Sequence, residues 1–65
     1  MNIEAIRSET IELIISHRIR ADIPVPVYYI KRLNKMTDEE LSLELATSYR
    51  DLCLKLESSA KERMN

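Results

Sequence analysis

The strongest pattern of hydrophobic and polar positions lies in the second half of the chain, from residue 37 to residue 63. Apolar residues recur there every three or four positions, which is the spacing of one side of an α-helix. Thr37 and Glu40 have the spacing of a capping box, and Met36 and Leu41 flank this box as a hydrophobic staple. The pattern predicts one long amphipathic helix over 37–63. Its apolar stripe comprises Leu41, Leu45, Tyr49, Leu52, Leu56 and Ala60.

The first segment, residues 3–20, has a wider hydrophobic surface. Its main stripe comprises Ile3, Ile6, Leu13 and Ile14, and Thr10 and His17 continue the same side. A second stripe at four-residue spacing comprises Ile11, Ile15 and Ile19. This spacing predicts a helix that contacts two neighbours. The β-branched residues within 10–15 leave a strand as the alternative for that stretch.

Two prolines, Pro24 and Pro26, interrupt the helical pattern between these segments. Proline favours extended geometry in the residue before it, so residues 22–26 predict an elbow. We expect Pro26 to open a short second helix over 26–35. One side of that helix is apolar and the other is basic. The apolar side comprises Tyr29, Ile30, Leu33 and Met36, and the basic side comprises Tyr28, Lys31, Arg32 and Lys35.

Together these segments predict an all-α fold, with three helices in one domain over 1–65. The chain contains no glycine, which tight strand turns usually require. A domain near this size buries only about 60% of the surface that its unfolded chain exposes. The single cysteine, Cys53, excludes an internal disulfide, and one histidine gives too few ligands for a structural zinc site. We therefore expect a second copy to complete a dimeric helical bundle.

Groups suited to catalysis are scarce. A nucleophile and a base would have to come from Cys53 and His17, and both lie on predicted apolar sides. A buried thiol stays protonated and unreactive. The sequence has no glycine-rich phosphate loop, no paired metal motif and no calcium loop. We expect no enzymatic activity, no cofactor and no metal, and we interpret His17 as a partly buried structural residue.

Hydrophobic residues beyond the main stripes indicate contact with another chain. The long helix carries two leucines away from its stripe, eleven positions apart and therefore on a common line. The second stripe of the first helix supplies three more candidates. The candidate dimer interface comprises Ile11, Ile15, Ile19, Leu43 and Leu54.

Charge is unevenly distributed along the chain. Residues 17–35 contain five basic residues and one acid, a net +4, whereas residues 1–16 carry −2 and residues 36–65 carry −3. A basic segment over 18–35 is typical of contact with phosphate or with an acidic partner. The alternative function is therefore a small DNA-binding regulator. Its candidate contacts are Arg18, Arg20, Tyr28, Lys31, Arg32 and Lys35.

The acidic first turn at Asp38, Glu39 and Glu40 would repel phosphate where a recognition helix normally docks. We therefore favour a homodimeric protein that binds another protein.

The chain has a family resemblance that rests on four features. They are its small size, its helical content, its lack of glycine and the segment Glu40-Leu41-Ser42-Leu43-Glu44-Leu45. It resembles small accessory proteins from the early region of lambdoid phages, between the recombination and excisionase genes. The resemblance implies a regulator that acts on a host protein through contact. The sequence shows no basic leader at its start and no apolar run near the ~20 residues of a membrane span. We expect a cytoplasmic protein in a bacterial or phage-infected cell.

Overall fold

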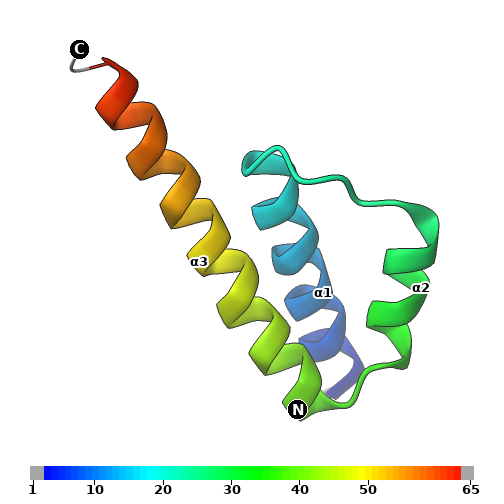
Figure 1. The fold of residues 1–65 in the computed structure, drawn as a ribbon. Helices are drawn as coiled ribbons and strands as arrows, with labels where there is room; N and C mark the ends of the chain where they lie inside the picture. The colour runs from blue at the N-terminus through cyan, green and yellow to red at the C-terminus, as the bar shows by residue number, and fades with distance from the viewer. Residues whose placement is uncertain (1–2, 64–65) are drawn as a thin grey trace.

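The computed structural model describes residues 3–63, and all of its regular structure is helical (Figure 1). The helices are α1 (Ile3–Arg20), α2 (Val27–Lys35) and α3 (Asp38–Arg63). The described residues include no strand. The predicted all-α fold with three helices is confirmed. The strand alternative for residues 10–15 is wrong, because α1 runs through them without a break.

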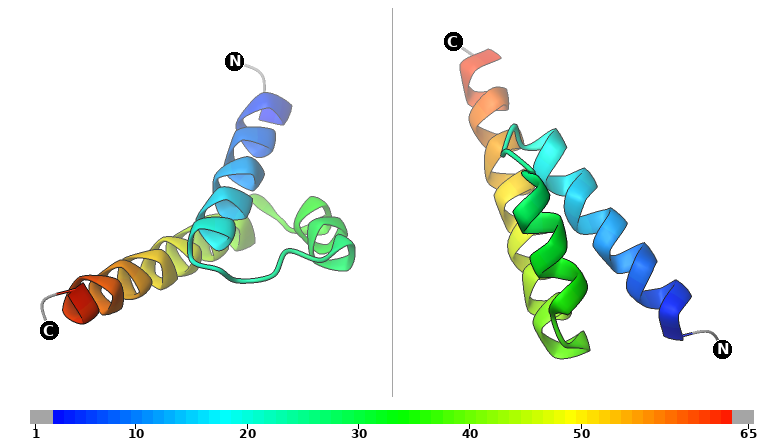
Figure 2. Two further views of the ribbon diagram at one scale, coloured as in Figure 1. Left: turned by 90° about the horizontal axis from the view of Figure 1, so that it is seen from above. Right: turned by 90° about the vertical axis from the view of Figure 1, so that its right-hand side faces the viewer.

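α1 and α3 run in the same direction, and α2 runs the opposite way (Figure 1). Two contacts set the register between α1 and α3. Arg7 pairs with Asp38, and His17 contacts Ser48, each across 31 positions of sequence. Seen from above, α1 and α3 diverge as a V, and α2 lies on one side of them (Figure 2). Within residues 3–63, no helix lies over the opposite side of the α1–α3 pair.

The core lies where all three helices meet. Its buried cluster consists of Ile14 from α1, Tyr29 and Leu33 from α2, and Leu41 from α3. Ile14 and Leu33 have no exposed surface. The residues packed around this cluster are Ile11, Ile15, Val25, Met36 and Leu45. As predicted, α1 contacts two neighbours.

α1 ends in a turn that the sequence did not reveal. Asp22 adopts a left-handed backbone with φ of 60°. The amide of Ile23 donates to the carbonyl of Arg18 at 2.8 Å, and the amide of Asp22 donates to Ile19 at 3.1 Å. This pair of bonds is a Schellman motif, in which glycine is the usual left-handed residue. Helix α1 therefore stops before the prolines, and residues 23–26 form the predicted elbow.

Pro26 precedes α2 instead of opening it. Its ψ of 161° is extended, so the first helical residue is Val27, one position later than predicted. The carbonyl of Pro26 still accepts from the amides of Tyr29 and Ile30. The predicted sides of α2 are confirmed. Tyr29 and Leu33 are buried, whereas Tyr28, Lys31, Arg32 and Lys35 are exposed.

The capping box of α3 is confirmed. The amide of Glu40 donates to the Thr37 hydroxyl at 3.2 Å, and the amide of Thr37 donates to the Glu40 carboxylate at 3.0 Å. The hydrogen bond that the Glu40 carboxylate accepts from the amide of Thr37 holds the pKa of Glu40 below its ordinary value. Met36 packs against the core cluster that contains Leu41, as the predicted staple requires.

The inward sides of α1 and α3 differ from the predicted main stripes. Ile14 is buried, but Ile6 and Leu13 are exposed. On α3 the buried positions are Leu41, Ser48 and Leu52, whereas Tyr49, Leu56 and Ala60 are exposed. The reason is geometric: α2 packs on only one side of the α1–α3 pair, so the buried side chains of α1 and α3 are those that face α2 as well as each other. The side chain of Ile3 lies outside the part of the chain whose side chains are described.

Candidate interaction surfaces

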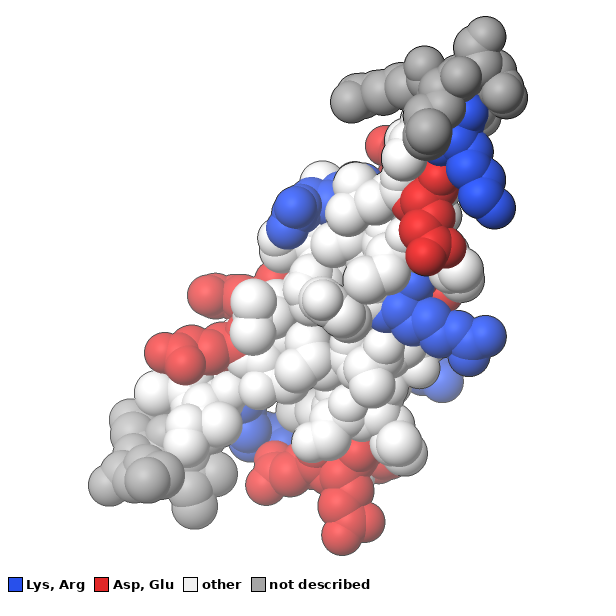
Figure 3. Space-filling model, turned by 90° about the vertical axis from the view of Figure 1, so that its left-hand side faces the viewer, with Lys and Arg blue, Asp and Glu red and all other residues white. Residues whose placement is uncertain are grey.

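The largest set of exposed apolar side chains lies on the side of the α1–α3 pair that faces away from α2. Ile6 and Leu13 are seven positions apart on α1, and Tyr49 and Leu56 are seven positions apart on α3, so each pair lies along one line of its helix. All four are between 47% and 59% exposed. We call these four residues the α1–α3 face. Figure 3 shows a broad uncharged surface with Lys, Arg, Asp and Glu at its edges.

A polar contact joins the two helices beneath this face. The Ser48 hydroxyl donates to the carbonyl of Leu45 at 2.9 Å. Its oxygen therefore accepts from His17 Nδ1, 3.1 Å away, which assigns the proton to Nδ1. The His17 ring also meets the Tyr49 ring edge-on, with 5.7 Å between centroids. The prediction of a partly buried structural histidine is confirmed.

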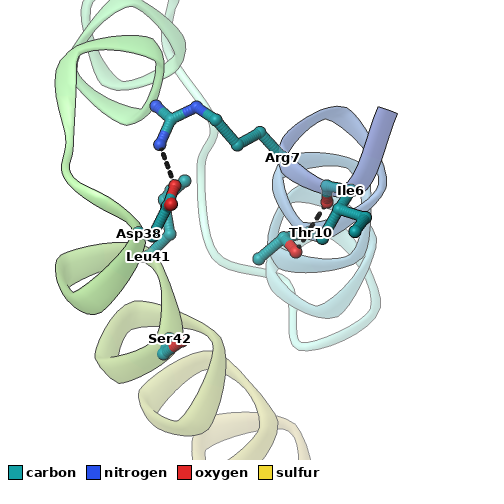
Figure 4. Close-up of a pocket in the computed structure, with 6 residues that line it drawn as sticks. All are labelled: Ile6, Arg7, Thr10, Asp38, Leu41 and Ser42. Atoms are coloured by element: carbon teal, nitrogen blue, oxygen red, sulfur yellow. Dashed lines mark hydrogen bonds and ion pairs between the residues drawn. The ribbon is translucent and has the colours of Figure 1, made fainter. Parts of the chain in front are cut away.

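Arg7 joins the same two helices near the start of α3 (Figure 4). Its guanidinium pairs with the Asp38 carboxylate and donates to the carbonyl of Met36 at 2.7 Å. One side chain thus ties α1 to the end of α2 and to the start of α3. The hollow beside it has a volume of about 260 Å³ and is open to solvent. Its lining comprises Ile6, Arg7, Thr10, Asp38, Leu41 and Ser42.

The five candidate dimer residues divide into two groups. Ile11 and Ile15 are partly buried and pack against the core of their own chain. Ile19, Leu43 and Leu54 are exposed, Leu43 at 71%. Leu43 and Leu54 lie about 140–160° around α3 from Leu56 and Leu41, so they form a separate outer line. The structure therefore does not bring the five candidates together on one surface.

The candidate basic contacts also divide. Arg18 is partly buried, and its guanidinium carbon is 4.0 Å from the centre of the Tyr29 ring. It donates to the carbonyl of Pro24 at 2.9 Å, and its buried Nε makes no hydrogen bond to any described residue. Arg20 is exposed at the end of α1. The other four, Tyr28, Lys31, Arg32 and Lys35, are exposed on the outer side of α2.

The inner side of α2 carries a hydrogen bond that sequence reasoning missed. The Tyr29 hydroxyl donates to the Glu44 carboxylate at 2.6 Å. Burial raises the pKa of Tyr29 to about 12, and the bond to Glu44 acts in the same direction. Ser48 and the Arg7–Asp38 pair were missed as well. The sequence did offer one indication of the Ser48 contact. Ser48 is a small polar residue next to the apolar stripe of one predicted helix, and His17 lies on the apolar side of another.

Residues 3–63 contain no group of three or more His, Cys, Asp or Glu side chains placed to hold a metal ion. Cys53 is a free thiol, half-buried on α3. No helix within the described residues has the length and apolar character needed to cross a membrane.

The chain was compared with protein-family models, with curated proteins and with solved structures. It matches none of them significantly.

Proposed function

We propose that this protein is a non-enzymatic interaction protein that pairs with a second copy of itself and regulates another protein by contact. The observation that carries the proposal is the α1–α3 face. Four large apolar side chains stand exposed along two helices of a 65-residue chain, and α2 covers only the other side. Contiguous apolar surface of this kind is typical of a protein-binding site.

Leu43 and Leu54, on the outer line of α3, supply a second candidate surface, and Ile19 is exposed separately at the end of α1. A protein with two separate apolar surfaces can pair through one and hold a partner with the other. The lambdoid-phage resemblance supports a host protein as that partner, in the cytoplasm of a bacterial or phage-infected cell. The proposal assigns no cofactor and no metal.

Sedimentation of the purified chain, combined with affinity capture from bacterial lysate, tests this function. We expect a dimer at micromolar concentration and a specific protein retained by the wild type. The variant Leu43→Glu/Leu54→Glu should remain helical and lose that protein if the outer surface binds it. A cooperatively folded monomer that retains no specific protein would contradict the proposal.

A second candidate function is DNA binding, and one observation favours it. Tyr28, Lys31, Arg32 and Lys35 are all exposed on one short helix, so three cations and an aromatic ring face solvent together. Phosphate contact by such a cluster would be strongest at low salt. Gel retardation of duplex DNA at low salt, lost in Lys31→Ala/Lys35→Ala, would support this function. A lack of retardation of any duplex would exclude it.

A further inference from the structure

We infer that the two copies pair through the α1–α3 face in an antiparallel arrangement, with a two-fold axis that crosses both helices. This inference rests on the self-association proposed above and assigns it a surface and an orientation. Three observations carry it: the excess exposed area of the chain, the position of the uncovered apolar side chains, and the order of charges along the two edges of the face.

The chain exposes more surface than a compact monomer of its size. Its accessible area is 5273 Å², whereas a folded monomer of 7.6 kDa is expected to expose ~4300 Å². The excess of roughly 1000 Å² exceeds the ~800 Å² that each partner buries in a standard interface. The radius of gyration, 13.6 Å, also exceeds the ~11 Å expected for a compact domain of this length. Part of this excess lies on the end of α3 that extends past α1 and α2, and the rest is of the size that one further copy covers.

Each edge of the α1–α3 face carries an acid followed by a base over the length that the two helices share; on α3, Glu57 and Lys61 continue the line beyond the level at which α1 ends. Glu9 and Arg20 lie eleven positions apart on the outer edge of α1, and Glu39 and Arg50 lie eleven positions apart on the outer edge of α3. Eleven residues are close to three full turns, so each acid and base lie along one line, about 16 Å apart. All four side chains are exposed, and none makes an ion pair within residues 3–63.

The parallel register of α1 and α3 brings the two acids to one end of the face and the two bases to the other. Arg7 lies level with Asp38 and His17 with Ser48, so Glu9 is near the level of Glu39 and Arg20 near that of Arg50. A two-fold axis across the helices turns the second copy end for end. Each acid then lies opposite a base on both edges, Glu9 opposite Arg20 of the second copy and Glu39 opposite its Arg50.

The other face-to-face arrangement gives the opposite result. A two-fold axis along the helices would lay α1 over α3 of the second copy in the same direction. Glu9 would then face Glu39, and Arg20 would face Arg50. Like charges would meet at both ends of the interface. The charge order therefore selects the antiparallel pair, in which Leu13 and Tyr49 are buried between the charged edges and Ile6 and Leu56 lie at the two ends of the interface.

Charge reversal measured by sedimentation equilibrium at low salt tests the orientation. In the antiparallel dimer, Glu9→Arg meets Arg20 of the second copy at two symmetric places, and we expect a Kd about tenfold higher than that of the wild type. Arg20→Glu should weaken pairing equally. The double variant Glu9→Arg/Arg20→Glu should return the Kd to within about threefold of wild type. If Glu9→Arg instead tightens the dimer, the parallel arrangement is correct and the inferred orientation is wrong.

Substitutions within the face test its location. Leu13→Glu/Tyr49→Glu should abolish the dimer, while the control Leu43→Glu/Leu54→Glu on the outer line of α3 should leave the Kd unchanged. If Leu13→Glu/Tyr49→Glu still forms the dimer and Leu43→Glu/Leu54→Glu does not, the inferred interface is wrong, although the proposed self-association stands. A wild-type chain that stays monomeric would instead overturn the self-association itself. Circular dichroism of each variant separates loss of pairing from loss of folding.

Discussion

The guanidinium of Arg18 stacks on the ring of Tyr29, 4.0 Å from its centre, and so joins the end of α1 to the inner side of α2. A cation over an aromatic face contributes about 0.5–2 kcal/mol, more when it is shielded from water. Arg18 also donates to the carbonyl of Pro24 in the elbow. The residue that the sequence marks as a phosphate contact is thus part of the structure that holds α2 in place.

Replacing Arg18 should therefore reduce stability. We expect Arg18→Ala to lower the free energy of unfolding by about 1–2 kcal/mol, because the stacking on Tyr29 and the hydrogen bond to Pro24 are lost. Urea denaturation followed by circular dichroism measures this loss. Lys31→Ala, which removes an exposed cation from α2, is the matched control and should change stability by less than about 0.5 kcal/mol. Equal effects of the two variants would contradict the structural role of Arg18.

Tyr29 predicts a stability change at alkaline pH. Its pKa is about 12 in the folded chain against an ordinary value of 10.0. The folded state therefore favours the neutral phenol, and this contribution is complete below pH 10 and lost as the pH rises toward 12. The urea midpoint of the wild type should fall more steeply across this range than that of Tyr29→Phe. Tyr28→Phe, altered at an exposed ring, should follow the wild type.

The capping box predicts a clear difference between two small substitutions at Thr37. Thr37→Ala removes the hydroxyl that accepts from the amide of Glu40, and we expect a loss of about 1 kcal/mol in the free energy of unfolding. Thr37→Ser keeps the hydroxyl and should be close to neutral. Thermal unfolding of both variants gives the measurement. Similar losses for Ala and Ser would show that the hydroxyl does not cap α3.

The left-handed turn after α1 predicts a stabilising substitution. Asp22 has φ of 60°, where glycine has no steric cost. Its exposed carboxylate lies 3.5 Å from Lys55, and an exposed ion pair of this kind contributes little. We expect Asp22→Gly to raise the free energy of unfolding by roughly 0.5 kcal/mol and Asp22→Ala to lower it. Chemical denaturation compares them, and a destabilised glycine variant would show that the Lys55 pair outweighs the backbone cost.

The existence and order of the helices could be predicted from the sequence, because three- and four-residue spacing and the Thr37–Glu40 box are local signals. The side that each helix turns inward could not. Tyr49 and Ser48 are neighbours, and their burial depends on where α1 and α2 lie. The local spacing predicts that Tyr49 belongs to the buried stripe of α3. In the structure it is Ser48 that is buried, because α1 brings His17 against it.

The candidate surfaces illustrate the same limit. Leu43 and Leu54 were recognised as exposed because their offset from the stripe is a property of α3 alone. Ile11 and Ile15 form an equally regular line, but the position of α2 draws them against the core. The spacing predicts Ile6 and Leu13 inside, but both are exposed, because no helix within residues 3–63 covers that side of α1. Regular spacing along a helix identifies a line of apolar residues. Whether that line is buried or exposed depends on where the neighbouring helices pack.

The C-terminal end of α3 extends past the other two helices, and this affects the rate at which its backbone amides exchange hydrogen with solvent. Lys55 pairs with Asp22 beside the end of α1, and α3 then continues to Arg63 past the other two helices (Figure 1). Backbone amides in a helix end without neighbours open by fraying and exchange their hydrogens far faster than amides near Leu41 or Leu52. Slower amide hydrogen exchange between residues 56 and 61 would therefore show that another chain binds there, and the measurement needs neither a label nor a known ligand.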